Sequence, residues 1–276
     1  SQAITDAIVT DLRAHGATLT TGRRVRTLAD VPHARALLLD LPAGAAAQLL
    51  GARLPARRRR ALRLFGRAAG AAAKVDLVVR GPIPWACPDI GRAGTVHLGG
   101  TAAQIGAAER DVARGRLPSA PVVLVSDPAQ IDPSRARPAG PDGDLRPVWA
   151  YAHVPLDCPV DPTRLVLQQI ERAAPGFTDT VVAARGIPAA QMAEHNPALL
   201  GGDIAMGSTS LWGMVARPRA AWDPYRLDGE GTYLCSAATP PGPGVHGMGG
   251  MHAARRALRQ VFGIRDLPPL SPLPGP

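Results

Sequence analysis

The sequence predicts a mixed α/β fold, and three features of the chain support this prediction. Near the N-terminus, apolar residues recur at the spacing of one helical face, in Ile4, Ile8 and Leu12. An apolar run at 34–42, ARALLLDLP, is typical of a buried strand and ends at Pro42. Further along, short alternating strands are interleaved with helices. With 276 residues, the chain can bury a sizeable core as one large domain or two ordinary ones.

The first quarter of the chain reads as a helix, strands and a second helix. The first helix ends at Gly16, a residue type that is enriched just past helix C-termini. The segment ATLTTGRRVRTL at 17–28 alternates in the manner of strands that are joined or bent at Gly22. The segment LPARRRRALRLFGRAAG at 54–70 predicts a helix, whose arginine run at 57–60 forms a solvated face.

The middle of the chain alternates strands with helices. Thr101 and Gln104 form a capping-box pattern that begins one helix. Asp161 as the N-cap and Pro162 at the first helical position begin another. His153 lies in an alternating segment, and we interpret it as a strand histidine rather than an acid–base group. The predicted strands are KVDLVVRGPIPW (74–85), GTVHLGG (94–100), APVVLVSD (120–127) and RPVWAYAHVPL (146–156).

Composition argues against several classes of protein. The net charge of +9 comes almost entirely from arginine, since Lys74 is the only lysine. Because codon drift in a GC-rich genome produces this bias, we expect no nucleic-acid partner. Cys87, Cys158 and Cys235 form no CxxC pair, and the histidines form no HExxH, so neither disulfides nor a metal site is expected. No transmembrane run or signal peptide is read; we expect a cytoplasmic location, with which peripheral membrane contact is compatible.

The C-terminal part contains an unusual junction between a strand and a helix. TYLCS at 232–236 predicts a short strand, and a helix with Met251 and Leu258 on one face follows. The prolines and glycines between them exceed the needs of a plain turn, which is the alternative interpretation. Glycines let a flat ligand lie against the backbone, and free N–H groups near 247–250 favour an anionic or electron-rich group. Residues 264–276 predict a disordered, proline-rich tail.

This junction resembles a known cofactor motif. GTYLCSAATPPGPGVHGMGGMHAARRAL at 231–258 is similar to the C-terminal FAD motif of the phytoene desaturase-like flavoproteins, a branch of the amine-oxidase superfamily. The stretch at 168–207, QQIERAAPGFTDTVVAARGIPAAQMAEHNPALLGGDIAMG, resembles the one that precedes this motif in these proteins. AGTVHLGGTAAQIGAAERDVARG at 93–115 resembles part of their substrate domain.

The resemblance implies a more specific fold than composition and periodicity do. It implies an α/β chain made of the later portion of a Rossmann-like FAD/NAD(P)-binding domain, with an inserted α+β substrate domain that contains an antiparallel sheet. Residues 1–55 and 201–263 are expected to be the discontinuous FAD-binding pieces. Residues 56–200 are expected to form the substrate domain.

The resemblance also implies a role for each residue of the motif. Cys235 and Ser236 would lie near the ribityl–pyrophosphate region, where the family often has Gly–Asp; the carboxylate is absent here. The glycine loop of the family falls on Gly242, Gly244 and Gly247. Val245, His246 and Met248 would lie near the isoalloxazine, with helix N–H groups facing the flavin N1/O2 side, where negative charge accumulates on reduction. No catalytic acid or base is assigned.

One motif of these flavoproteins is missing. They open with a βαβ unit carrying GxGxxG, whose helix end holds the FAD pyrophosphate, and this unit is absent from the 276 residues. We therefore expect the downstream portion of a longer FAD-dependent oxidoreductase, with the dinucleotide-binding segment in cis or in trans. The implied reaction is desaturation or double-bond isomerisation of an apolar, lipid- or carotenoid-like substrate, with hydride transfer to flavin N5. The alternative is a non-catalytic binding or assembly subunit that lacks FAD.

Overall fold

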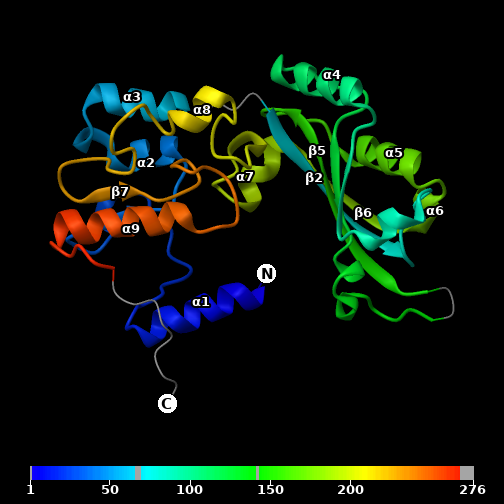
Figure 1. The fold of residues 1–276 in the computed structure, drawn as a ribbon, viewed down its shortest axis with the longest axis horizontal. Coiled ribbons are helices and arrows are strands. Elements are labelled where there is room, and N and C mark those ends of the chain that lie inside the picture. Colours follow the sequence, from blue (N-terminus) through cyan, green and yellow to red (C-terminus); the bar gives the residue numbers. More distant parts are fainter. Residues whose placement is uncertain (1, 66–69, 141–142, 268–276) are drawn as a thin grey trace.

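The computed structural model describes residues 2–65, 70–140 and 143–267 and has a mixed α/β architecture (Figure 1). The helices are α1 (Gln2–Ala14), α2 (Ala43–Leu50), α3 (Ala56–Phe65), α4 (Ala102–Ala113), α5 (Thr163–Ala173), α6 (Phe177–Thr180), α7 (Met192–His195), α8 (Leu211–Val215) and α9 (Met248–Val261). The strands are β1 (Leu37–Leu39), β2 (Gly70–Arg80), β3 (Thr95–Leu98), β4 (Val123–Ser126), β5 (Leu145–Pro155), β6 (Val181–Ile187) and β7 (Thr232–Leu234).

The first core is built around two short parallel strands from opposite ends of the chain. Leu37 of β1 lies opposite Thr232 of β7, and Leu39 lies opposite Leu234. Successive residues of a strand face opposite sides, so Leu234 packs with α2 and α3 while Tyr233 packs with α9. The result is a helix–sheet–helix sandwich, in which Figure 1 shows α2 and α3 on one side of β7 and α9 on the other.

The second core is built on a five-stranded antiparallel sheet with the order β3-β4-β5-β2-β6. β2 and β5 pair along their full length, from Gly70 opposite Pro155 to Arg80 opposite Leu145. One face of the sheet is closed by α5 and α6, whose Ile170 and Phe177 are buried against it. The other face carries Trp149, Tyr151 and His153, which are partly exposed; α4 contacts β5.

β1 leaves one edge of the parallel pair open. The Leu37 N–H donates to the Gly231 carbonyl, and the Leu39 carbonyl accepts from the Cys235 N–H, so these groups face β7. The backbone groups of Leu38 therefore face away, where the part of the chain that the structure describes forms no further strand. α1 has no buried residue, and its apolar stripe with Ile4 is exposed. An open strand edge offers unpaired N–H and carbonyl groups, so β1 can pair with a further strand. We call the first core with its helices the first lobe, and the second core with its helices the second lobe.

Several predicted elements differ from the observed ones. Residues 17–28 form no strand, and no strand in the described ranges pairs with them; Asp30 instead accepts from the Arg26 and Thr27 N–H groups and holds a turn. α3, which falls in the range expected to form the substrate domain, packs on α2, and its Leu62 is buried in the first core. Asp161 was expected to be the N-cap of α5, but the N-cap is Pro162, so Asp161 lies one residue before it. Its carboxylate still accepts a hydrogen bond from the Thr163 N–H.

Two further expectations concern the ends and the surface of the chain. Residues 264–267 of the expected tail form neither helix nor strand, and residues 268–276 lie outside the described residues. Within the described ranges, no helix is long and apolar enough to cross a membrane.

Candidate functional site

The candidate site begins where the two parallel strands end. Because Leu39 and Leu234 are register partners, the next residues, Asp40 and Cys235, leave the sheet side by side. Asp40 is exposed, whereas Cys235 is partly buried. The carboxyl ends of parallel strands are the edge at which open α/β sheets bind ligands. The junction predicted from the sequence therefore lies at a chemically suitable edge, and Asp40 brings to it a carboxylate that sequence reasoning did not assign.

Ser236 fixes the start of the bend rather than facing outward. Its hydroxyl donates to the Leu41 carbonyl at 2.7 Å and accepts from the Ala238 N–H at 3.2 Å. Thr239 donates from its hydroxyl to the Ser236 carbonyl at 2.7 Å. Both side chains are buried, and the bond from Ser236 to Leu41 ties the chain after β7 to the chain after β1. Ser236, which was expected near a ribityl chain, therefore stabilises the loop through internal hydrogen bonds.

The three glycines of the bend adopt left-handed backbone conformations that favour glycine. Their φ angles are +105° at Gly242, +150° at Gly244 and +64° at Gly247. At Gly242 a Cβ atom would lie 2.9 Å from Nη1 of Arg217 and 3.0 Å from Cε of Met214, so the bend presses on these two side chains. Gly247 is the N-cap of α9, and its surroundings are open.

His246 occupies part of the space in which a planar ring was expected. A Cβ atom at Gly244 would lie 2.8 Å from Cδ2 of His246, so the imidazole covers this glycine. The Met248 N–H, expected to be free, donates to Nδ1 of His246 at 3.0 Å. Val245 is fully exposed, as the tip of the bend. The bend is therefore open to solvent at Val245 and Gly247, but the imidazole of His246 lies between them and covers Gly244.

α9 is seated directly on the end of β7. A Cβ atom at Gly249 would lie 2.7 Å from the Cys235 carbonyl oxygen and 3.1 Å from the Ser236 carbonyl oxygen. Glycine at this position therefore allows the first turn of α9 to touch the strand end. The positive end of the helix dipole consequently lies beside the carboxyl ends of β1 and β7.

The Cys235 thiol is held protonated by its surroundings. Burial raises its pKa to about 11, and the neighbouring Asp40 carboxylate acts in the same direction. At pH 8 about one thiol in a thousand is then ionised, and the thiolate is the reactive form. We expect iodoacetamide to alkylate exposed Cys87 at least about a hundredfold faster than Cys235 at this pH, as measured by mass spectrometry of the two peptides.

A variant separates the effect of the Asp40 charge on Cys235 from the effect of burial. Asp40→Asn removes the smaller of the two causes, so alkylation of Cys235 is expected to accelerate while Cys87 is unchanged. Equal rates for the two cysteines in the folded wild-type chain would contradict the assigned environment of Cys235.

A buried arginine connects the bend to the rest of the site. Arg217 is fully buried and donates from Nη2 to the carbonyls of Ala205 and Met206 at 2.9 and 3.3 Å. Asp203 accepts from the N–H groups of Ala205 and Gly207, so the two charged side chains hold opposite sides of one loop. Burial raises the pKa of Asp203 and lowers the pKa of Arg217, while each charge counteracts the shift of the other.

The loop that Arg217 holds forms one wall of a cavity of about 410 Å³ over the second lobe. The start of β2, the end of β5 and α4 form the other walls. His153 lies in it, and Nδ1 of its ring is 2.6 Å from Oε1 of Glu109 on α4. We call this space the His153 cavity. Sequence reasoning did not pair these residues, because Glu109 and His153 come from different elements and only folding brings them together.

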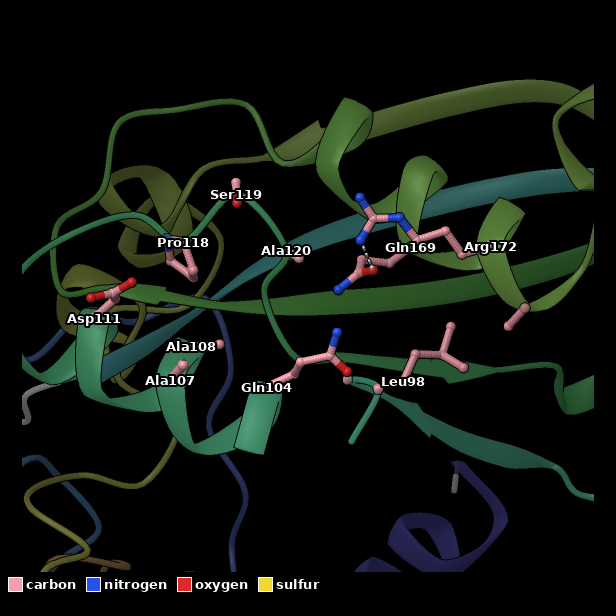
Figure 2. Close-up of a pocket in the computed structure, with 13 residues that line it drawn as sticks. Leu98, Gln104, Ala107, Ala108, Asp111, Pro118, Ser119, Ala120, Gln169 and Arg172 are labelled. Atoms are coloured by element: carbon pink, nitrogen blue, oxygen red, sulfur yellow. Dashed lines mark hydrogen bonds between the residues drawn. The ribbon is translucent and has the colours of Figure 1, made fainter. Parts of the chain in front are cut away.

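A second cavity of similar volume lies between α4 and α5 (Figure 2). Figure 2 shows Arg172 directed at Gln169, and the Arg172 guanidinium donates to the Gln169 amide oxygen at 2.9 Å. The amide nitrogen of Gln169 donates to the Pro121 carbonyl, and Asp111 is paired with Arg116. Because these polar groups bind one another, this cavity is a weaker candidate than the other two regions.

Comparisons with known proteins add no assignment. The sequence matches none of the protein-family models with which it was compared, and none of the curated proteins. Among the residues that the structure describes, no three His, Cys, Asp or Glu side chains are grouped so as to hold a metal ion.

Proposed function

We propose that the chain is the downstream portion of an FAD-dependent oxidoreductase of the phytoene desaturase-like class. The observation that carries the proposal is the position of the glycine–proline bend. It lies at the carboxyl ends of two parallel strands and leads at once into a helix whose N-terminus is seated on those strands. This is the arrangement that a flavin half-site of a Rossmann-like domain requires. That the first core is the later portion of a Rossmann-like FAD-binding domain is part of the same proposal.

The residues at the bend fit one side of a flavin. The open surroundings of Gly247 leave room for a flat ring, and the dipole of α9 favours the negative charge that a reduced flavin carries on its N1/O2 side. Asp40 supplies a carboxylate at the strand end, where the Gly–Asp of the similar proteins is replaced by Cys235 and Ser236. A ring at Gly244 would require the exposed imidazole of His246 to rotate away, which would break its one hydrogen bond, from the Met248 N–H.

The other side of the flavin site is assigned to a dinucleotide-binding segment. The open edge of β1 at Leu38 offers N–H and carbonyl groups to a further strand, and α1 exposes a separate apolar stripe. The open edge belongs to the parallel pair that the segment carrying GxGxxG would extend. Supplied in cis or in trans, this segment would complete the sheet.

Bound FAD would supply a hydride acceptor for a C–H bond of an apolar substrate, so that a double bond forms or moves. The contribution of this chain would be to hold and orient. The bend would position the ring, the N-terminus of α9 would stabilise its charge, and the second lobe would enclose the substrate and exclude water. The buried Ser236 and Thr239 would keep the bend in one shape, which lowers the entropy lost on binding.

The test is to read the coding DNA upstream of Ser1 and express the whole frame. A continuous frame with GxGxxG, yielding a yellow protein with flavin absorbance bands, is the expected result. Asp40→Asn in that protein is expected to reduce the flavin retained after dialysis, while the exposed Asp179→Asn serves as the matched control. A stop codon followed by a new start, together with a protein that has no flavin bands even with candidate partners, would overturn the proposal in favour of a binding or assembly subunit.

A further inference from the structure

The His153 cavity combines an apolar wall with polar groups from α4, β5 and the loop at 203–210. Its wall is formed largely by residues with short or apolar side chains, and the volume falls within the range of about 300–1,000 Å³ that is usual for small-molecule sites. No lysine or arginine is among its described lining residues. The short or apolar lining residues are Gly70, Ala71, Ala72, Val112, Ala113, Ile204, Ala205 and Gly207.

The two carboxylates of the cavity, Asp203 and Glu109, already have hydrogen-bond partners. The carboxylate of Asp203 accepts from backbone N–H groups of its own loop. Glu109 binds Nδ1 of His153, which fixes the orientation of the ring. Among the described residues nothing hydrogen-bonds to Nε2, so this second ring nitrogen is left for a ligand, beside the hydroxyls of Tyr151 and Thr209 that also line the cavity. A carboxylate that orients a histidine in this way is a recurrent means of presenting one ring nitrogen to a substrate.

β5 extends the cavity with flat apolar surface. Alternation along the strand places Trp149, Tyr151 and His153 on the same face of the sheet. Their rings are stacked, with centroids 6.3 Å apart for Trp149 and Tyr151 and 5.9 Å apart for Tyr151 and His153. The interplanar angles are 21° and 8°, so the three rings form a nearly parallel series. Burial raises the pKa of Tyr151, so its hydroxyl is neutral at physiological pH.

We propose that the His153 cavity binds an uncharged, mainly apolar molecule that donates a hydrogen bond from a hydroxyl group to Nε2 of His153, with Glu109 as the positioning residue. Among the lining residues that the structure describes no side chain is cationic, which disfavours anions, and both carboxylates already have hydrogen-bond partners, which disfavours a cation. In the proposed oxidoreductase this site would hold the polar end of the substrate; that assignment alone rests on the proposed function. The binding site itself stands on the geometry of this chain.

The experiment uses 2-naphthol and naphthalene as a matched pair of probes on the chain as it is, with no flavin present. Equilibrium dialysis measures both dissociation constants. We expect 2-naphthol to bind about tenfold more tightly, the effect of one good hydrogen bond in a partly buried site. His153→Phe keeps an aromatic ring beside Tyr151 but removes the acceptor, so the ratio is expected to fall to about one. Glu109→Gln, which loosens the ring, is expected to give an intermediate ratio.

The chain provides matched controls in another place. Glu194 and His195 are exposed neighbours, so Glu194→Gln and His195→Phe make the same chemical changes away from the cavity and should leave the ratio unchanged. Circular dichroism checks that each variant is folded. Failure of the folded wild-type chain to bind either probe would overturn the proposal. So would a tenfold ratio that persists in His153→Phe, or one that is lost equally in His195→Phe. None of these outcomes depends on whether a longer protein binds FAD.

Discussion

Replacing Arg217 by methionine is expected to lower the free energy of unfolding by about 3–5 kcal/mol, because two carbonyls lose a charged donor, at about 1–3 kcal/mol for each unsatisfied buried group, and a nearby buried carboxylate loses its compensating charge. The guanidinium is fully buried, holds the carbonyls of Ala205 and Met206, and lies 5.4 Å from the centre of the Phe65 ring. Methionine fills similar apolar volume but leaves both carbonyls without this donor. It also leaves the buried charge of Asp203 without its compensating cation.

Urea denaturation of the variants measures this effect. Arg185→Met is the matched control, because Arg185 is exposed on β6, and it is expected to change the free energy of unfolding by less than about 0.5 kcal/mol. Arg217→Lys keeps the charge but not the planar fork, so an intermediate loss is expected. The double variant Arg217→Met with Asp203→Asn should lose less than the sum of the two single variants, since the isolated carboxylate is gone. Strict additivity would contradict the coupling of the two side chains.

The same residue has a consequence for the site. Arg217 lies against Gly242 of the bend and also holds the loop at 205–207, which forms a wall of the His153 cavity. One side chain therefore fixes the geometry of both candidate regions. In a folded Arg217→Lys variant, we expect weaker binding of 2-naphthol even though the side chain is not a lining residue of the cavity.

The sequence predicted local features better than contacts between distant segments. The helix at Thr101 is confirmed with its capping box, and the apolar runs around Leu38 and Val125 are strands as predicted, because capping and burial patterns are encoded within a few residues. The alternation at 17–28 was misleading. A strand needs a partner, and partner choice is a property of the whole fold that the alternation pattern does not contain.

In the candidate site, too, local features were predicted and contacts between distant segments were not. Composition and turn chemistry predicted a stiff glycine bend between a strand and a helix, and this geometry is present at 235–248. Three other residues could not be predicted. Asp40 became adjacent to Cys235 only through the register of β1 and β7, and Glu109 reached His153 only through the packing of α4 on β5. Arg217 is one arginine among many in the sequence, and its burial is a tertiary property.

The contact between α9 and β7 provides the second large effect. Gly249→Val is expected to lower the free energy of unfolding by about 3 kcal/mol, at the upper end of the usual cost of overpacking. The cost is high because the new Cβ atom would lie 2.7 Å from the Cys235 carbonyl oxygen and 3.1 Å from that of Ser236. Both neighbours are backbone atoms, and they cannot rotate away as a flexible side chain would.

Gly250→Val is a closely matched control, because it places the same side chain one residue later in the same helical turn. Nothing lies within 4 Å of a Cβ atom at Gly250, so its effect should stay within about 0.5 kcal/mol. If α9 is displaced in Gly249→Val, the surroundings of Cys235 open, and its alkylation at pH 8 should accelerate relative to wild type while that of Cys87 does not. Equal stability of the two variants would mean that α9 does not rest on the strand end. The bend would then lack the fixed helix N-terminus that a flavin half-site requires.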